Sequence, residues 1–258
     1  SIGRLLIPFP SFSIFRLLFK SNALIAHLPC PTILIILLLA KLINKNRLII
    51  IYWHAFIKPR DGIAGIFENL YQYLALKLIK NFPVICTSPI ILKALKKEGF
   101  ASELLHCIPC SLNRKIETAC ELIWTKRKVN LLNSGTIIAI GRLDSYKRLD
   151  ILIKAFVQVE SANRLLILGD GPDRLKLESL ANSLKRYGKE ILFYGRVNES
   201  LKLKLLSHSD LLVLAADRCN EAFGIAQLEA MACGIPALAF RNNLSGMYWV
   251  SNLPDFGW

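Results

Sequence analysis

The sequence lacks a hydrophobic run long enough to cross a membrane. Its longest apolar stretch, Thr32–Ala40, has nine residues, whereas a membrane-spanning helix needs about 20. Because lysine and asparagine residues follow it, we interpret this stretch as a buried helix that leads into a buried strand at Arg47–Tyr52. No cleavage site of small residues follows an apolar start, so a secretory signal peptide is not indicated either.

Motifs of metal sites and of dinucleotide binding are also missing. The seven cysteines have irregular spacing, and Cys107-x-x-Cys110 has no second pair or histidine cluster after it. We therefore predict reduced thiols in a cytoplasmic protein. No Asp-x-Asp pair is present, so neither a metal ion nor a cofactor is expected. Gly169-Asp170-Gly171 has Arg174 where a third glycine would stand, which argues against a nicotinamide-dependent oxidoreductase.

Acidic residues are scarce in the first half of the chain. Residues 1–133 hold 18 Lys and Arg against six Asp and Glu, whereas residues 134–258 hold 15 against 13. Such an imbalance predicts that the first half faces an anionic partner: a membrane surface, a phosphorylated acceptor or nucleic acid. The alternative is a solvated basic surface. The start, Arg4–Lys20, mixes Phe and Leu with Arg and Lys, as a segment on an anionic membrane does, although Pro8 and Pro10 interrupt any single helix there.

Short apolar strands alternate with amphipathic helices in the second half. The strands are expected at 136–140, 164–168, 191–194, 211–215 and 236–240. This alternation predicts a parallel sheet covered on both faces, which is a doubly wound, Rossmann-like domain. The first half is also α/β, with strands expected at 47–52, 84–86 and 104–108 and helices at 66–80 and 89–98. We place the boundary in the charged stretch Asn113–Ser134, which divides the chain into domains 1–130 and 131–258.

Ligands of such sheets bind beyond the carboxyl ends of the strands, so the residues there are the candidates. Gly141 and Arg142 follow the strand at 136–140, and Lys147 comes soon after. Two cations at the mouth of a parallel sheet would hold a diphosphate, the arginine by its planar fork and the lysine as a point charge. The alternative is a pair of surface cations without a ligand.

A second candidate segment follows the strand at 211–215. Gly224 stands where a helix is expected to begin, and the free amides of a first helical turn suit a phosphate. Glu221 precedes this helix and Glu229 lies within it, and a carboxylate accepts hydrogen bonds from two adjacent sugar hydroxyls at once. The alternative is a glutamate that favours the helix dipole and another on the surface.

The segment Glu221–Glu229 (EAFGIAQLE), continuing as AMACGIP, resembles the hallmark of glycosyltransferase family 4 (group 1), a retaining family of GT-B fold. Further segments stand in the family's order and spacing: GRLDSYKRLD (141–150), LILGDGP (166–172), FYGRVNE (193–199) and SDLLVLAA (209–216). In the first half, YWH (52–54), CTSP (86–89) and CIPCSLN (107–113) look more loosely like the family's acceptor-side strand ends. The family's Gly-rich loop near the start and its closing helices are not visible, so we expect a fragment with an incomplete first domain and a truncated second one.

The resemblance implies a role for each matching residue. Arg142 and Lys147 would hold the donor diphosphate beside Gly141, and Glu229 would bind the ribose diol. Glu221 would bind the donor sugar. The remaining donor contacts would be the backbone at Phe223, Gly224 and Ile225, the backbone near Val197 beside the base, and His54 reaching toward the sugar. The catalytic set would be His54, Glu221, Arg142 and Lys147.

The resemblance implies transfer of a hexosyl group from a nucleotide diphosphate sugar to a hydroxyl acceptor with retention. We expect a role in cell-surface polysaccharide or glycolipid synthesis, without a metal, in the cytoplasm or on the cytoplasmic face of a membrane, with a lipid-linked acceptor among the candidates and no nucleic acid. Two alternatives stay open: a GT-B sugar-nucleotide epimerase, and a membrane-associated binding module that is not an enzyme.

Overall fold

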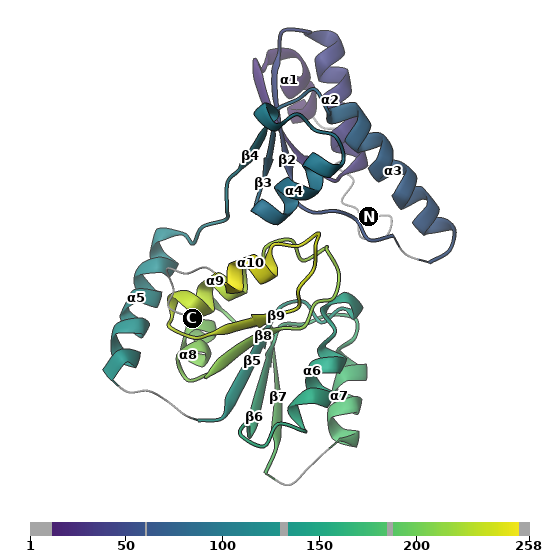
Figure 1. Cartoon of the computed structure of the whole chain (residues 1–258). Helices are drawn as coiled ribbons and strands as arrows, with labels where there is room; N and C mark the ends of the chain where they lie inside the picture. Colours follow the sequence, from purple (N-terminus) through teal and green to yellow (C-terminus); the bar gives the residue numbers. More distant parts are fainter. Residues whose placement is uncertain (1–11, 60, 130–133, 185–187, 253–258) are drawn as a thin grey trace. The chain divides into compact units, whose positions relative to one another are not determined.

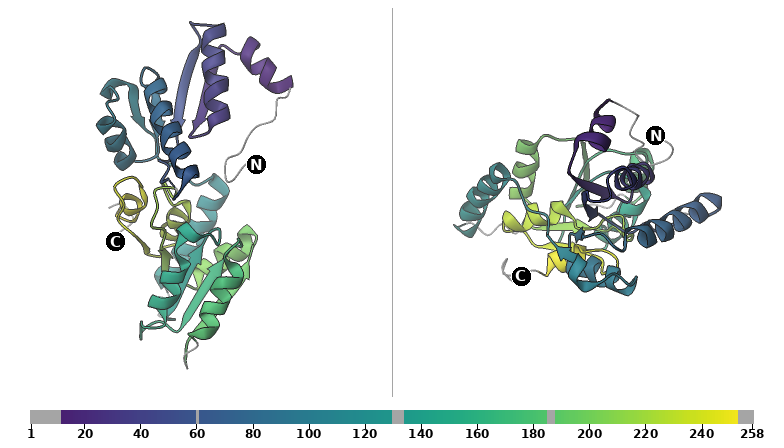
Figure 2. Two further views of the ribbon diagram at one scale, coloured as in Figure 1. Left: turned by 90° about the vertical axis from the view of Figure 1, so that its right-hand side faces the viewer. Right: turned by 90° about the horizontal axis from the view of Figure 1, so that it is seen from above.

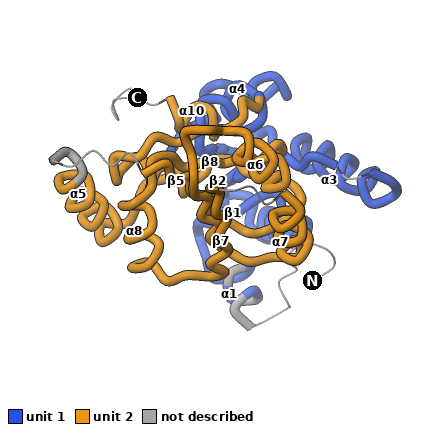
Figure 3. Tube along the Cα trace, turned by 90° about the horizontal axis from the view of Figure 1, so that it is seen from below, with its two compact units in different colours: residues 1–109, 243–246 blue, residues 110–242, 247–258 orange. Residues whose placement is uncertain are grey.

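A computed structural model describes residues 12–59, 61–129, 134–184 and 188–252. Its contacts divide the chain into two compact units (Figure 3). Unit 1 comprises residues 1–109 with 243–246, and unit 2 comprises residues 110–242 with 247–258. Among the helices of the described ranges, none has the length and hydropathy of a bilayer span.

Unit 1 is a four-stranded parallel sheet with connecting helices (Figure 1). Its sheet order is β1-β2-β3-β4, so every strand pairs with its neighbours in sequence. Its elements are α1 (Phe12–Lys20), β1 (Ala23–Leu28), α2 (Pro31–Ile43), β2 (Leu48–Trp53), α3 (Ile63–Ile79), β3 (Val84–Cys86), α4 (Pro89–Lys97) and β4 (Leu105–Cys107). The strands and helices predicted in the first half are therefore present, and β1 and α1 are added to them.

Burial alternates along the strands of unit 1. In β1, Ala26 and Leu28 are buried whereas Ile25 and His27 are exposed. Right-handed crossovers between strands in sequential order place the connecting helices on one face of a sheet, which is the physical reason for this asymmetry. His27 therefore lies on the side of β1 that stays open to solvent.

The predicted buried helix at Thr32–Ala40 is only half buried. α2 begins with a proline at its first turn, where no amide donor is needed. It buries Leu34, Leu37 and Ala40, whereas Ile35 and Leu39 are 58% and 45% exposed. A run of apolar residues supplies side chains to every side of a helix, and only one side of α2 faces the sheet. The expected helix is therefore present, but only its side toward the sheet is buried.

Unit 2 is a five-stranded parallel sheet in the order β7-β6-β5-β8-β9. Its elements are α5 (Arg114–Val129), β5 (Thr136–Ile140), α6 (Leu149–Phe156), β6 (Arg164–Leu168), α7 (Arg174–Ser183), β7 (Glu190–Gly195), α8 (Glu199–Ser207), β8 (Leu211–Leu214), α9 (Ile225–Ala232), β9 (Ala237–Ala239) and α10 (Met247–Ser251). All five predicted strands are present. Asn198 caps α8, because its side chain accepts a hydrogen bond from the amide of Leu201.

Helices cover both faces of the unit 2 sheet (Figures 1 and 2). On one face, Phe156 of α6 and Leu177 of α7 pack in a core with Ile167. On the other face, a second core joins the remaining helices to the sheet through Cys120 of α5, Leu206 of α8 and Ala230 of α9. This arrangement confirms the predicted doubly wound sheet.

The stretch predicted to hold the domain boundary is largely helical. Residues 114–129 form α5, whose Cys120 is fully buried in the core of unit 2. Trp124 lies so close to Gly234 that a Cβ at that glycine would be 2.1 Å from the indole ring. The units therefore divide between Pro109 and Cys110 rather than after residue 130. Charged residues stand between the apolar positions of α5, so the composition of this segment is that of a charged linker although one side of the helix is apolar.

We predict that Gly169→Ala destabilises unit 2. Gly169 follows β6 with φ +129°, and a Cβ there would lie 1.9 Å from the carbonyl oxygen of Gly141. Strain and overpacking together should lower the free energy of unfolding by at least about 2 kcal/mol, measured by urea titration with circular dichroism. The matched control is Gly188→Ala, because Gly188 has φ +78° and nothing within 4 Å of its added Cβ. That control should cost only about 1 kcal/mol, and equal losses would contradict the proposed close approach.

Candidate functional site

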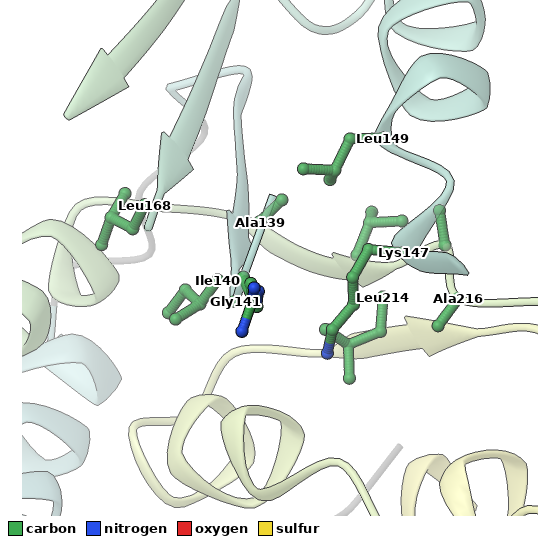
Figure 4. A pocket seen from close by; sticks show the side chains of 11 residues that line it. Ala139, Ile140, Gly141, Lys147, Leu149, Leu168, Leu214 and Ala216 are labelled. Carbon is green, nitrogen blue, oxygen red and sulfur yellow. The ribbon is translucent and has the colours of Figure 1, made fainter. Parts of the chain in front are cut away.

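The candidate site lies where β5 and β8 end side by side in unit 2. After β5 the chain continues to β6, which lies toward one edge of the sheet. After β8 it continues to β9, which lies at the opposite edge. The carboxyl ends of such diverging strands leave a crevice in which α/β sheets bind ligands. A small pocket occupies this place and is lined by Gly141, Arg142, Lys147, Ala215 and Ala216 among others (Figure 4).

The loop after β5 owes its shape to close backbone contacts and to Arg148. The amide of Gly141 donates to the carbonyl of Leu168 at 2.9 Å. Arg148 adopts the left-handed conformation (φ 47°) where α6 begins, and its guanidinium contacts Asp150 at 3.1 Å and Asp217 at 2.8 Å. Since Asp217 follows β8, this arginine ties the two loops together. The hydrogen bond from Arg148 lowers the pKa of the Asp150 carboxyl below its ordinary value.

Lys147 and Glu221 form an ion pair across the two loops. Their side chains are 12% and 20% exposed, so the pair is largely enclosed. The Arg142 side chain is 64% exposed, and its nearest carboxylate is Asp144 at 3.7 Å. The two cations that the sequence grouped thus differ: Lys147 is already paired inside the site, whereas Arg142 is held only loosely at its edge.

The start of α9 depends on Gly224. This residue has φ +81°, and a Cβ there would lie 2.2 Å from the side-chain oxygen of the buried Gln227. The first-turn amides of a helix have no partners within the helix, so this end of α9 carries partial positive charge. Ile225 is 50% exposed at this end, whereas Phe223 is buried against Trp249. Phe223 therefore contributes a core side chain, and only its backbone is left for a ligand.

Glu229 lies inside α9 and is paired with a lysine that the sequence analysis did not single out. Its Oε1 is 2.8 Å from Nζ of Lys202 on α8, and Nζ of Lys202 is also 2.9 Å from Oε1 of Glu199. Burial works against the charge on Lys202, but hydrogen bonds to both glutamates raise its pKa above the ordinary value. Helical spacing would have found it, because Lys202 stands four residues before the buried Leu206.

Val197 and His54 lie at other strand ends. Val197 follows β7 and packs, partly buried, against the core that contains Leu206. His54 follows β2 in unit 1 and is exposed, so it is not a buried histidine. The reach of His54 toward a donor sugar stays a prediction.

A second histidine, His27, accompanies His54. Nδ1 of His27 is 2.7 Å from Nε2 of His54, and the ring centroids are 5.0 Å apart. The Tyr52 ring stacks on His27 and is tilted against His54. Desolvation and then the nearby His27 lower the pKa of His54 below its ordinary value of 6.5. The pairing was not predicted, because the two histidines come from different strands.

The cysteines show features of structural thiols. None of the seven is part of a disulfide, and Cys86, Cys120, Cys219 and Cys233 are buried. Burial, and then the neighbouring Cys107, raise the pKa of Cys86 to about 12, so this thiol is a poor nucleophile at neutral pH. No group of three or more potential metal ligands occurs in the described part of the chain.

The curated relatives are glycosyl- and sugar-transferring enzymes. The N-acetyl-alpha-D-glucosaminyl L-malate synthase of Bacillus anthracis is 34% identical over 107 residues, which is 41% of this chain and 27% of that protein. A GDP-mannose-dependent monoacylated alpha-(1-6)-phosphatidylinositol monomannoside mannosyltransferase of Corynebacterium glutamicum is 32% identical over 124 residues, 45% of this chain and 32% of that protein. The chain thus spans about a third or less of these relatives.

Solved structures share the fold of the chain. The Anabaena Alr3699/HepE structure with UDP and glucose matches with a TM-score of 0.65 at 18% identity and covers 88% of this chain and 61% of that one. Sucrose-phosphate synthase of Thermosynechococcus elongatus matches with a TM-score of 0.68 at 19% identity and covers 92% and 60%. These are GT-B glycosyltransferases, so the predicted fold class is confirmed.

The family model described as "Glycosyl transferases group 1" matches residues 123–248. This range contains both loops of the candidate site, the Lys147–Glu221 pair and the whole of α9. It begins within α5, in agreement with the place of that helix in unit 2. Residues 123–248, which are just under half of the chain, are therefore similar to the glycosyl transferases group 1 family.

Proposed function

We propose that this chain acts in the transfer of a hexosyl group from a nucleotide diphosphate sugar to a hydroxyl acceptor, with retention at the transferred carbon. The observation that carries the proposal is the convergence of Lys147 and Glu221 at the switch point of unit 2. The printed names of the relatives support it, since one is a GDP-mannose-dependent mannosyltransferase and one solved neighbour holds UDP and glucose.

The donor diphosphate would lie between Arg142, Lys147 and the start of α9 at Gly224. These groups neutralise the charge that develops on the departing diphosphate, which is the main requirement of the reaction. Two cations and a helix end supply this charge without a metal ion or cofactor. The acceptor hydroxyl would attack on the face of the sugar that the diphosphate leaves, which keeps the configuration.

Binding of the diphosphate would change the partner of Lys147. In the free chain this lysine is paired with Glu221. A diphosphate carries more negative charge than one carboxylate, so it would displace Glu221 from Nζ of Lys147. The freed Glu221 could then accept hydrogen bonds from sugar hydroxyls. One exchange of partners would thus couple diphosphate binding to sugar binding.

We propose an anionic membrane surface as the place of the acceptor. α3 carries a row of exposed apolar side chains, here called the α3 row: Ile63, Ile66, Phe67, Leu70 and Leu74, which are 75%, 67%, 67%, 51% and 45% exposed. Their spacing of three and four residues places them on one side of the helix. Exposed Lys58 and Lys77 lie near its ends in sequence, within the basic half of the chain. Such a face suits an anionic leaflet on the cytoplasmic side that presents a lipid-linked acceptor.

The first prediction from this proposal concerns the cations. Lys147→Ala and Arg142→Ala should each weaken binding of UDP or GDP in calorimetry, because loss of a charge-assisted hydrogen bond typically costs about 1.5–3 kcal/mol. Glu221→Gln should leave this binding unchanged or tighter, since Lys147 loses a competing partner. Lys154→Ala, an exposed lysine of α6, is the control. Unchanged affinity in both alanine variants would remove the diphosphate clamp from the proposal.

The second prediction concerns the α3 row. Ile66→Ser with Phe67→Ser should reduce co-sedimentation with phosphatidylserine-containing vesicles several-fold, because each side chain loses apolar area buried in the leaflet. Added salt and replacement of Arg4, Arg16 and Lys20 by Ala should also reduce it; of these, Arg4 lies outside the described residues. Leu175→Ser on α7 is the matched control, since Leu175 is 81% exposed in unit 2. Equal partitioning onto neutral and anionic vesicles is the outcome that speaks against a membrane face.

The third prediction concerns His54. Because the pKa of His54 is lowered, its imidazole is neutral at pH 7. Its hydrogen bonds to a sugar would be lost only as the pH falls through the pKa of His54. His27→Phe keeps a ring in place but removes the second titrating group, so the pKa of His54 should rise. NMR titration of the imidazole carbon-bound protons measures this shift, with His208→Phe as control. No shift in the His27 variant would show that the pair is not electrostatically coupled.

A further inference from the structure

We infer that Lys202 is a positioning residue, which holds the Glu229 carboxylate in place to accept the two hydroxyls of a nucleotide ribose. The inference rests on the proposed function, because it assigns a support to the residue that would bind the ribose. It concerns residues of unit 2 alone.

The contacts form a chain of three side chains. Nζ of Lys202 lies 2.8 Å from Oε1 of Glu229 and 2.9 Å from Oε1 of Glu199. The Glu229 and Lys202 side chains are 8% and 12% exposed, whereas that of Glu199 is 61% exposed. Lys202 therefore bridges an enclosed carboxylate and an outer one. Both contacts are made by the same ammonium group.

Enclosure makes this partner necessary. A carboxylate taken out of water is unfavourable unless a charge and hydrogen bonds compensate for the lost hydration. Glu229 is one of the buried residues of α9. In the part of the chain that the structure describes, Lys202 is the basic partner of Glu229, and the raised pKa of this lysine keeps the ammonium charged.

The contact with Lys202 leaves acceptor positions on the Glu229 carboxylate for a ligand. An ionised carboxylate has about four acceptor positions on its two oxygens. The contact with Lys202 is made at Oε1. The remaining positions suffice for the two adjacent hydroxyls of a ribose, and a fixed carboxylate binds them without first losing rotational freedom. Lys202 would thus raise affinity for the ribose without touching it.

The experiment compares nucleotides with and without those hydroxyls. Calorimetry measures binding of UDP and GDP against their 2′,3′-dideoxy forms. The unaltered chain should prefer the hydroxyl-bearing forms about 10-fold or more, the usual result when buried acceptors lose their donors. Lys202→Met should bind UDP or GDP more weakly and distinguish the two forms less than about 2-fold. Lys202→Arg, which keeps the charge, should restore part of the preference.

Matched variants separate positioning from a merely structural role. Lys204→Met replaces an exposed lysine of the same helix and should keep the full preference. Lys202→Gln is a second neutral variant in case Lys202→Met does not fold, and thermal unfolding is measured for both. A neutral variant that melts earlier yet keeps the preference for the hydroxyls would overturn the inference, since Lys202 would then only join α8 to α9.

Failure of the inference differs from failure of the proposed function. If the unaltered chain bound neither UDP nor GDP, the nucleotide site itself would be wrong, and the inference with it. If the unaltered chain bound them and preferred the hydroxyls, but the Lys202 variants did so equally, only the role of Lys202 would be overturned.

Discussion

The pairing of β5 with β8 is the constraint on which the site of unit 2 depends. It places two loops side by side although the residues that meet there, Lys147 and Glu221, are 74 positions apart in sequence. Parallel strands that diverge to opposite sides of a sheet leave a crevice between their following loops. The close approach at Gly169, where no Cβ fits, lets the β6 end lie against the loop after β5. The backbone thus brings together the two loops that carry Lys147 and Glu221.

Within that frame, two lysine–glutamate pairs organise the polar groups. Lys147 with Glu221 and Lys202 with Glu229 each set a largely enclosed carboxylate against an ammonium group. Enclosed pairs of this kind exclude water and keep both side chains in one arrangement. The first pair spans two loops and would open when a diphosphate competes for Lys147. The second spans two helices and would stay closed. In the proposed function the two glutamates would therefore contribute to ligand binding in different ways.

Unit 1 differs from unit 2 in how its sheet is covered. Its strands run in sequential order, and His27 and Ile25 remain on an open side. Together with the α3 row, this gives unit 1 a largely apolar and basic surface, whereas unit 2 buries its sheet between two helical layers. We propose that this surface of unit 1 meets a lipid leaflet that presents the acceptor.

Periodicity and motif spacing predicted the strands of unit 2, the helix at 225–232 and the segments 141–150 and 221–229. They could be predicted because periodicity and spacing are local properties of a sequence. It did not reveal that α5 belongs to unit 2, since charges between its apolar positions mask its buried side. Nor did it show that α2 is half exposed. The contacts between ionisable groups became visible only in the folded chain. They pair Lys147 with Glu221, Lys202 with Glu229 and His27 with His54. Each pair joins residues from separate elements, and such contacts depend on sheet order and helix placement rather than on any local pattern.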